Sequence, residues 1–364
     1  MKSLDDVTEI RAYFFGNEMQ KKNVYEQFII PYFNQTNILF HAERDWYGGP
    51  NFRVVTTDNK IDIELFKEKF MSYCEEQFGL LDENQLINEV ETYVRNTEIV
   101  SQMERRSNIA ISIDHHLQVT HQPIDSNYVK KRFNSFNHFR IHTELLFIIQ
   151  VFINNHIQVL SSLTKEKQLE FVTRAFYDVL SVSKFEKKDA VLVYISNIEG
   201  VLAIAETLGM KERYLQVYNQ MYDILNPKTF FLNEDYYASF GTTWLQTVEK
   251  MHAEIVDQLP LLEVDEEGYY SREEQYDLLL KNITDINSEF HNELVAKNIN
   301  DLLQHEEHQI FKVLINIIYK TVHMLGIHFN EKNAACYLVS RYVLEQNNTT
   351  WDAILNERGE SFVF

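Results

Sequence analysis

The stretch ILFHAERDWYGGPNFRVV, residues 38–55, decides how the N-terminal part of the chain folds. Apolar and polar residues partly alternate on both sides of DWYGGP, and this alternation is typical of a half-buried strand. The paired glycines permit positive φ, and Pro50 stops one strand before the next begins. The sequence therefore predicts a β-hairpin with its turn at residues 45–50.

Two further segments of the first 120 residues show the same strand signal. EIRAYFF at 9–15 precedes the hairpin, whose own arms are predicted as strands at 37–43 and 51–57, and NIAISID at 108–114 follows it. Helical spacing of apolar residues appears between them, in VYEQFIIPYFNQ at 24–35 and IELFKEKFMSYCEEQFG at 63–79. We expect one sheet flanked by helices.

From about residue 140 onward the apolar period is helical, as in ELLFIIQVFINNHIQVL at 144–160 and IFKVLINIIYKTVHML at 310–325. The predicted fold class is therefore α+β, with an N-terminal β-sheet and flanking helices packed on a largely helical C-terminal half. Only 10 Gly and 5 Pro occur in 364 residues, which predicts compact structure without a flexible linker.

Composition excludes several classes of protein. With 34 basic and 54 acidic residues, the net charge of −20 disfavours nucleic acid as the main partner. The acidic start MKSLDDVTEI predicts no secretion signal, and the apolar run at 145–153 is too short to span a membrane. Cys74 and Cys336 lie far apart, as expected of reduced thiols, so we predict a cytoplasmic protein.

Two histidine pairs have a spacing that suits a metal. His138 and His142 are one helical turn apart, and His305 and His308 share a helical face. No cysteine or carboxylate motif joins either pair, so we predict no metal site. The sequence also lacks a P-loop, a dinucleotide-binding glycine motif and a G-x-S-x-G elbow, which excludes the common nucleotide-binding and hydrolase classes.

Arg44 and Arg53 stand on opposite arms of the predicted hairpin, close to its turn. A pair of guanidinium groups there could hold a carboxylate or peptide carbonyls. Surface salt bridges are the alternative, since arginines on exposed strands are common.

Residues 38–55 resemble the strand pair that marks the C-terminal domain of lantibiotic dehydratases, with Arg44 and Arg53 in its two arginine positions. EIRAYFFGNEMQKKNVYEQFIIPYF is similar to that family's first strand and helix. YVKKRFNSFNHFRIHTELLFIIQVF, with Arg132, is similar to its Arg-Tyr segment, and VLINIIYKTVHMLGIHF, with His323, to its His-Met helix. The resemblance implies a single domain over 1–364, with a sheet-containing part at 1–125 and a mainly helical part at 126–364.

Members of this family remove glutamate from glutamylated Ser or Thr to leave dehydroamino acids. Related stand-alone proteins of thiopeptide pathways join two dehydroalanines in a formal [4+2] cyclisation that makes a pyridine ring and releases the leader peptide. The resemblance therefore implies a lyase or cyclase that needs no cofactor. Its partner would be a leader-bearing precursor peptide, and a separate glutamylating dehydratase subunit is an open second partner.

The resemblance also implies the site. Its substrate-binding residues would be the arginines, Arg44, Arg53 and Arg132. Its catalytic residues would be His323 as a base, with Tyr47 and Tyr128 as proton shuttles. The family's glutamate before the Arg-Tyr pair is Val129 here, and its Asn-Arg after His-Met is absent. Cyclisation is therefore the first expectation, with glutamate elimination and a non-catalytic scaffold that binds the precursor as alternatives.

Overall fold

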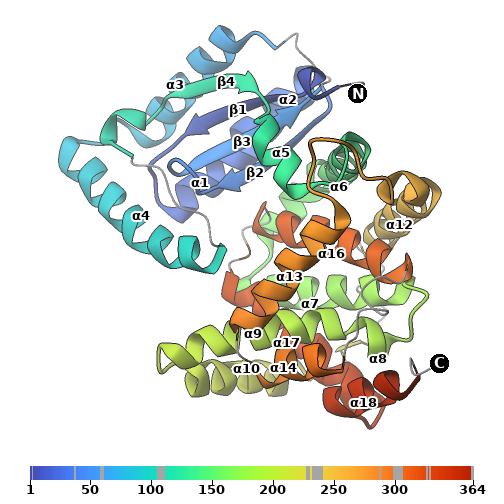
Figure 1. Cartoon of the computed structure of the whole chain (residues 1–364). Helices are drawn as coiled ribbons and strands as arrows, with labels where there is room; N and C mark the ends of the chain where they lie inside the picture. Colours follow the sequence, from blue (N-terminus) through green and yellow to red (C-terminus); the bar gives the residue numbers. More distant parts are fainter. Residues whose placement is uncertain are drawn as a thin grey trace. The chain divides into compact units, whose positions relative to one another are not determined.

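The computed structural model describes residues 1, 3–36, 38–57, 61–104, 111–226, 230–231, 241–286, 288–297, 306–324, 327 and 329–361. The chain forms two compact units (Figure 1). Unit 1 comprises Met1–Val129 and Ile149–Gln158, and unit 2 comprises Lys130–Ile148 and Val159–Phe364. The predicted single domain with a change at residue 125 stays a prediction, although the chain passes into unit 2 only a few residues later.

Unit 1 contains a four-stranded antiparallel sheet in the order β2-β3-β1-β4. The strands are β1 (Thr8–Tyr13), β2 (Phe40–Asp45), β3 (Asn51–Thr56) and β4 (Val119–Pro123). The helical elements are η1 (Leu4–Asp6), α1 (Glu18–Val24), η2 (Tyr25–Ile29), α2 (Ile30–Thr36), α3 (Ile63–Phe78), α4 (Glu83–Glu104) and η3 (Ile113–His115). α5 (Ser126–Arg132) and α6 (Phe136–Ser162) contribute residues to both units.

The predicted hairpin is confirmed. β2 and β3 pair in the register Phe40↔Thr56 to Asp45↔Asn51, and Gly48 and Gly49 have φ of 78° and 121°. The strand expected at 9–15 is also present as β1. Glycine is favoured at both turn positions because an L side chain rarely adopts such φ values.

The strand predicted over 108–114 is wrong where the structure describes it. Residues 108–110 lie outside the described part, and Ser112 begins a capping box that starts the 3-10 turn η3. The fourth strand is β4, which follows Leu117 with its φ of 63°. β4 is an edge strand whose residues are largely exposed, so it lacks the apolar alternation by which a half-buried strand is recognised.

The core of unit 1 lies between the apolar face of the sheet and the helices α1, η2, α2 and α3. Ile10, Ala42 and Val54 are fully buried on that face. Phe33 of α2 stacks on Phe40 of β2 with ring centroids 4.9 Å apart, and Phe66 of α3 is fully buried in the same aromatic cluster. Figure 1 shows α1 and α2 behind the sheet.

A buried glutamine of α6 completes this unit. Gln150 is fully buried, and its Oε1 accepts from the Ala42 N–H at 3.0 Å. Its Nε2 donates to the Tyr25 hydroxyl at 3.1 Å. The polar residue that interrupts the apolar run at 145–153 therefore bonds the sheet to its helices.

Unit 2 is helical in its described residues. Its helices are α7 (Lys165–Val182), α8 (Lys187–Ala190), α9 (Leu192–Thr207), α10 (Lys211–Leu225), α12 (Thr242–Leu262), α13 (Arg272–Ile286), α14 (Glu289–Ala296), α16 (Glu306–Met324), α17 (Phe329–Gln346) and α18 (Trp351–Ser361). α17 is central and packs on both α7 and α9. Its fully buried Ala334 and Ala335 allow close helix approach.

The predicted α+β class with a helical majority is confirmed by these two units. Cys74 and Cys336 are buried free thiols, as expected. Two segments, Phe136–Ser162 and Lys187–Thr207, are long and apolar enough to cross a membrane, but 50% and 56% of their apolar windows are buried inside the structure. Burial of this kind is also found in the core helices of soluble proteins.

Candidate functional site

The face of the sheet opposite the aromatic core carries charged side chains on three adjacent strands. Residues directly opposite one another in an antiparallel pair project to the same face. The register places Arg53 of β3 between Arg11 of β1 and Glu43 of β2. Glu9 and Asp45 project to the same face, two residues along from Arg11 and Glu43. We call these five residues the charged cluster.

The two guanidinium groups of the cluster are joined by a shared carboxylate. Arg53 Nε donates to Glu9 Oε2, and Arg53 Nη1 donates to Glu43 Oε1 at 2.5 Å. Arg11 Nε donates to Glu9 Oε1 at 2.5 Å, and its Nη1 donates to Asp45 Oδ2 at 2.8 Å. Arg53 and Glu9 have side chains only 9% and 5% exposed, so these ion pairs are shielded from water.

Charge and burial compete within the cluster. Burial raises the pKa of the Glu9 carboxyl, but Arg53 and Arg11 together lower that pKa by a larger amount, so the net shift is downward. Burial lowers the pKa of Arg53, and Glu43 and Glu9 raise it by more. The Glu9–Arg53 and Glu9–Arg11 ion pairs therefore stay charged near neutral pH. Three carboxylates face two guanidinium groups, so the cluster is negative overall.

One side-chain nitrogen of the buried Arg53 donates no hydrogen bond to a described residue. The hydrogen bonds to Glu9 and Glu43 use Nε and Nη1 of Arg53. Arg53 Nη2 has no hydrogen-bond partner in the part of the chain that the structure describes. Because a guanidinium has five N–H donors, Arg53 can still donate to an incoming oxygen.

Tyr128 is brought to Arg53 by α5. The Asp125 carboxylate accepts from the backbone N–H of Tyr128 at 3.3 Å at the start of this helix, and the Tyr128 ring centroid lies 6.0 Å from Arg53 Cζ. Val129, the next residue, is fully buried. The position at which the resemblance expects a glutamate is thus a core position here.

Tyr47 contacts the cluster through its backbone. Its carbonyl accepts from Arg11 Nη1 at 3.1 Å. The Tyr93 hydroxyl of α4 donates to the Trp46 carbonyl and accepts from the Gly49 N–H at 3.1 Å. The hairpin turn is therefore tied to both the cluster and α4, while the catalytic role predicted for the Tyr47 side chain stays a prediction.

The structure does not bring Arg44 and Arg53 together. Arg44 is opposite Phe52, whereas Arg53 is opposite Glu43, so the two arginines project to opposite faces of the hairpin. Arg44 Nη2 donates to Glu18 Oε2 of α1 at 2.6 Å. Nearness to the same turn suggested a guanidinium pair, but the pleat of the strands separates the two groups.

The other two predicted residues belong to unit 2. Arg132 is the exposed last residue of α5. His323 lies in α16, and its side chain is outside what the structure describes. Their predicted roles stay predictions.

The histidine pairs have other surroundings. His138 Nδ1 lies 2.5 Å from Asn134 Oδ1, and burial, with a smaller effect of Lys312, lowers its pKa to about 4. His142 packs edge-on against Phe133 with ring centroids 5.1 Å apart. His305 lies outside the described residues. Among those described, no three His, Cys, Asp or Glu residues are grouped as a metal site would need.

Four members of the charged cluster were not predicted: Glu9, Arg11, Glu43 and Asp45. A local signal for two of them exists, because EIRAY places Glu9, Arg11 and Tyr13 on one face of β1 by strand alternation. The charged cluster combines residues from strands that are distant in sequence. Together with Tyr128, these residues surround the guanidinium of Arg53, whose Nη2 is unused within the described residues. The unused N–H groups of Arg53 can bind a carbonyl oxygen, and the Tyr128 ring lies near the same guanidinium.

The fold belongs to the α+β class, with a small antiparallel sheet and a helical majority. One solved structure with this fold is described as "Pyridine synthase, TbtD, from thiomuracin biosynthesis". It matches with a TM-score of 0.59 and 10% sequence identity, over 93% of this chain and 98% of that chain. At this identity the likeness shows the fold alone. No protein family matches the sequence, and no curated protein matches it.

Proposed function

We propose that this chain modifies a ribosomally made precursor peptide of thiopeptide type, joining two dehydroalanines by formal [4+2] cyclisation to form a pyridine ring and release the leader peptide. Two observations support the proposal. The fold is that of a pyridine synthase over nearly the whole chain. The charged cluster offers Arg53 Nη2 beside Tyr128, and this observation carries the proposal.

The cyclisation requires a peptide amide to react as its iminol tautomer, so a proton must move from the amide nitrogen to the oxygen. A donor aimed at that oxygen stabilises the charge that develops there, and removal of one such donor typically costs about 100-fold in rate. Arg53 Nη2 is the donor that we assign to this role. Because Glu9 and Glu43 fix the guanidinium on two sides, its third side is held in place before substrate arrives.

The charge of the cluster favours cyclisation over glutamate elimination. A glutamylated residue carries carboxylates, and an eliminating enzyme must hold them with cations that are not already neutralised. Arg53 and Arg11 are each bonded to two carboxylates. A neutral amide oxygen can accept a hydrogen bond from this cluster, whereas a second anion would be repelled by it.

We assign proton transfer to Tyr128, whose ring lies 6.0 Å from Arg53 Cζ. The reaction then loses water and the leader peptide, and both departures need a proton donor. The resemblance adds His323 as a base, Tyr47 as a second shuttle and Arg132 as a substrate contact.

Mass spectrometry separates the three candidate functions. Incubation with a leader-bearing peptide that contains two dehydroalanines should release the free leader and a dehydrated macrocycle. Loss of glutamic acid from a glutamylated peptide would instead establish elimination. Tight binding with no mass change in either peptide would establish the scaffold and overturn the proposal.

Variants of the sheet locate the reaction. Arg53→Lys keeps the positive charge but removes the planar guanidinium with its several N–H donors, and should lower kcat by about 100-fold. Arg95→Lys, on the exposed surface of α4, is the matched control and should change it by less than about twofold. Arg44→Lys tests the opposite face of the hairpin. An equal loss in Arg44→Lys would contradict the assignment to the charged cluster.

Two further variants test the proton transfers. Tyr128→Phe keeps the ring but removes the hydroxyl, so kcat should fall by about 100-fold while the peptide still binds. His323→Gln should lower kcat by about 100-fold, because it removes the predicted base. An unchanged kcat would remove His323 from the mechanism.

A further inference from the structure

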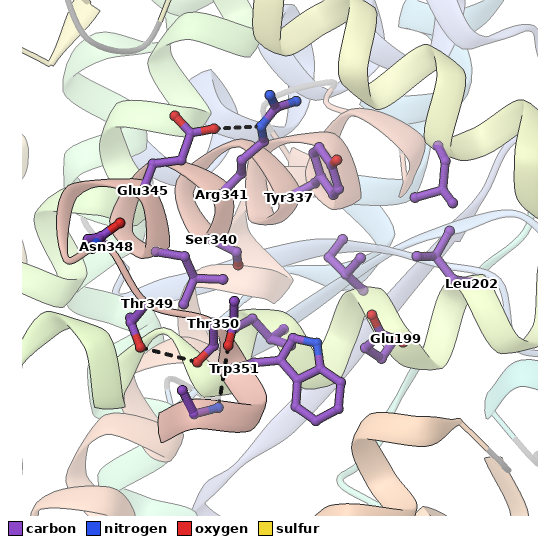
Figure 2. A pocket seen from close by; sticks show the side chains of 15 residues that line it. Glu199, Leu202, Tyr337, Ser340, Arg341, Glu345, Asn348, Thr349, Thr350 and Trp351 are labelled. Atoms are coloured by element: carbon purple, nitrogen blue, oxygen red, sulfur yellow. Dashed lines mark hydrogen bonds and ion pairs between the residues drawn. The ribbon is translucent and has the colours of Figure 1, made fainter. Parts of the chain in front are cut away.

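Unit 2 contains a cavity of about 800 Å³, a size typical of small-molecule sites (Figure 2). It lies where α9, α10 and α17 meet the start of α18. Ile195, Ile198 and Leu202 recur at helical spacing along α9 and are buried in its wall. Trp351 and Tyr337 add aromatic rings. The lining is therefore mostly apolar.

Among the polar groups of this lining, a hydroxyl and a carboxylate have no partner within the described residues. Ser340 is 6% exposed, and its hydroxyl makes no hydrogen bond there. The half-buried carboxylate of Glu199 likewise has no hydrogen bond or ion pair with a described residue. Burial raises the pKa of the Glu199 carboxyl. Lys211 lowers this pKa by a smaller amount, and Glu289 raises it slightly more. A hydroxyl and a carboxylate of the lining are thus available to a ligand.

The arginine of the wall is already satisfied. Figure 2 shows Arg341 and Glu345 paired with each other, with 2.9 Å between Nε and Oε1. Arg341 Nη1 also donates to Asn219 Oδ1 at 2.8 Å, and the guanidinium lies 4.0 Å from the ring centroid of Tyr222. An anionic ligand would find no unpaired cation in this lining, whereas a cationic ligand would find Glu199.

We propose that this cavity binds an organic cation with an apolar body, with its ammonium group at Glu199 and its apolar part against α9 and Trp351. An ammonium group is attracted by a carboxylate, and an apolar chain is stabilised by burial against aliphatic side chains and an indole ring. An N–H donor of the same ligand would satisfy the buried Ser340 hydroxyl. The inference does not depend on the proposed cyclisation, because it uses residues of the other unit and no precursor peptide.

The test is calorimetric titration of the full chain with n-decylammonium and with decanoate, each below its critical micelle concentration. Decylammonium should bind at least about tenfold more tightly than decanoate, because one charge-assisted hydrogen bond corresponds to that factor or more. Hydrogen exchange should slow in residues 192–202 and 337–353, which would place the ligand in this cavity. Equal or tighter binding of decanoate would overturn the proposal.

Variants separate this site from general attraction to an acidic protein. Glu199→Gln should weaken decylammonium binding by at least about tenfold. Glu212→Gln changes the net charge equally, but Glu212 is exposed at the start of α10, outside the cavity lining, so its affinity should stay within about twofold. Equal effects of the two variants would overturn the proposal.

A tripeptide, acetyl-Phe-Lys-Phe-amide, distinguishes two sources of the cation. Tighter binding of the tripeptide than of decylammonium would support a lysine of a peptide as the ligand. Tighter binding of decylammonium would support a free amine. Absence of binding by both probes would overturn the proposal.

Discussion

Replacing Arg53 by methionine keeps an unbranched apolar stem but removes the cation that Glu9 and Glu43 share. Removing one partner of a buried ion pair typically lowers the free energy of unfolding by about 3–5 kcal/mol. Arg11 remains 2.5 Å from Glu9, and Glu43 is 15% exposed, so we expect the lower end of that range, about 3 kcal/mol. The opening free energy of the sheet should fall by this amount at neutral pH.

Hydrogen exchange followed by mass spectrometry measures this effect locally. A loss of about 3 kcal/mol should speed exchange about 150-fold in the amides of β1 and β3 that open only with the sheet. Arg95→Met on the surface of α4 is the control and should leave these rates unchanged. An acceleration of less than about fivefold in Arg53→Met would refute the reasoning.

The pH dependence provides a second check. The pKa of Glu9 is lowered from its ordinary value of 4.5, so the stability that its ion pairs contribute is present above that value. It is lost as the pH falls through the lower pKa of the folded protein. The difference between wild type and Arg53→Met should therefore shrink as the pH falls below 4.5. A constant difference would mean that Arg53 acts through packing instead of charge.

Three other predictions concern stability. The Phe15 N–H donates to His116 Nδ1 at 3.1 Å, and burial lowers the pKa of His116 to about 4. The melting temperature should therefore rise with pH between about 4 and 6.5, and His116→Asn should reduce this slope. An equal slope for wild type and variant in calorimetry would contradict this. At Gly49, φ is 121° and a new Cβ would lie 3.3 Å from the Tyr13 ring, so Gly49→Ala should destabilise the protein by about 1–3 kcal/mol in urea unfolding. Gly79→Ala should cost less, because no atom lies within 4 Å of its new Cβ. The reverse order would be inconsistent with this explanation. The Phe66 ring is fully buried, so Phe66→Ala should lower the free energy of unfolding by about 3–5 kcal/mol and Phe66→Leu by much less. Similar urea midpoints for the two variants would show that this ring is not tightly packed.

The parts of the fold that local chemistry determines could be predicted from the sequence. Gly48, Gly49 and Pro50 specify the turn by their backbone preferences, and the helical spacing of apolar residues identifies most of unit 2. β4 could not be recognised, because an edge strand exposed along its length does not need the alternation that marks a half-buried one.

The candidate site was harder to predict than the hairpin that carries it. Arg53 could be singled out, but its partner could not. The register pairs residue 53 with residue 43 and not 44, and a change of one residue reverses the face of every side chain. Arg11 and Glu9 reach Arg53 through the pairing of β1 with β3, which joins segments about forty residues apart and has no local sequence signal.

Gln150 constrains the order in which the protein can fold during synthesis. The four strands of unit 1 are complete by Pro123, yet the residues at 149–158 that finish the unit are made later. Until Gln150 leaves the ribosome, the Ala42 N–H and the Tyr25 hydroxyl lack its side chain as a partner. A nascent chain arrested before residue 149 should therefore remain sensitive to protease in its sheet, and one arrested well beyond residue 158 should resist.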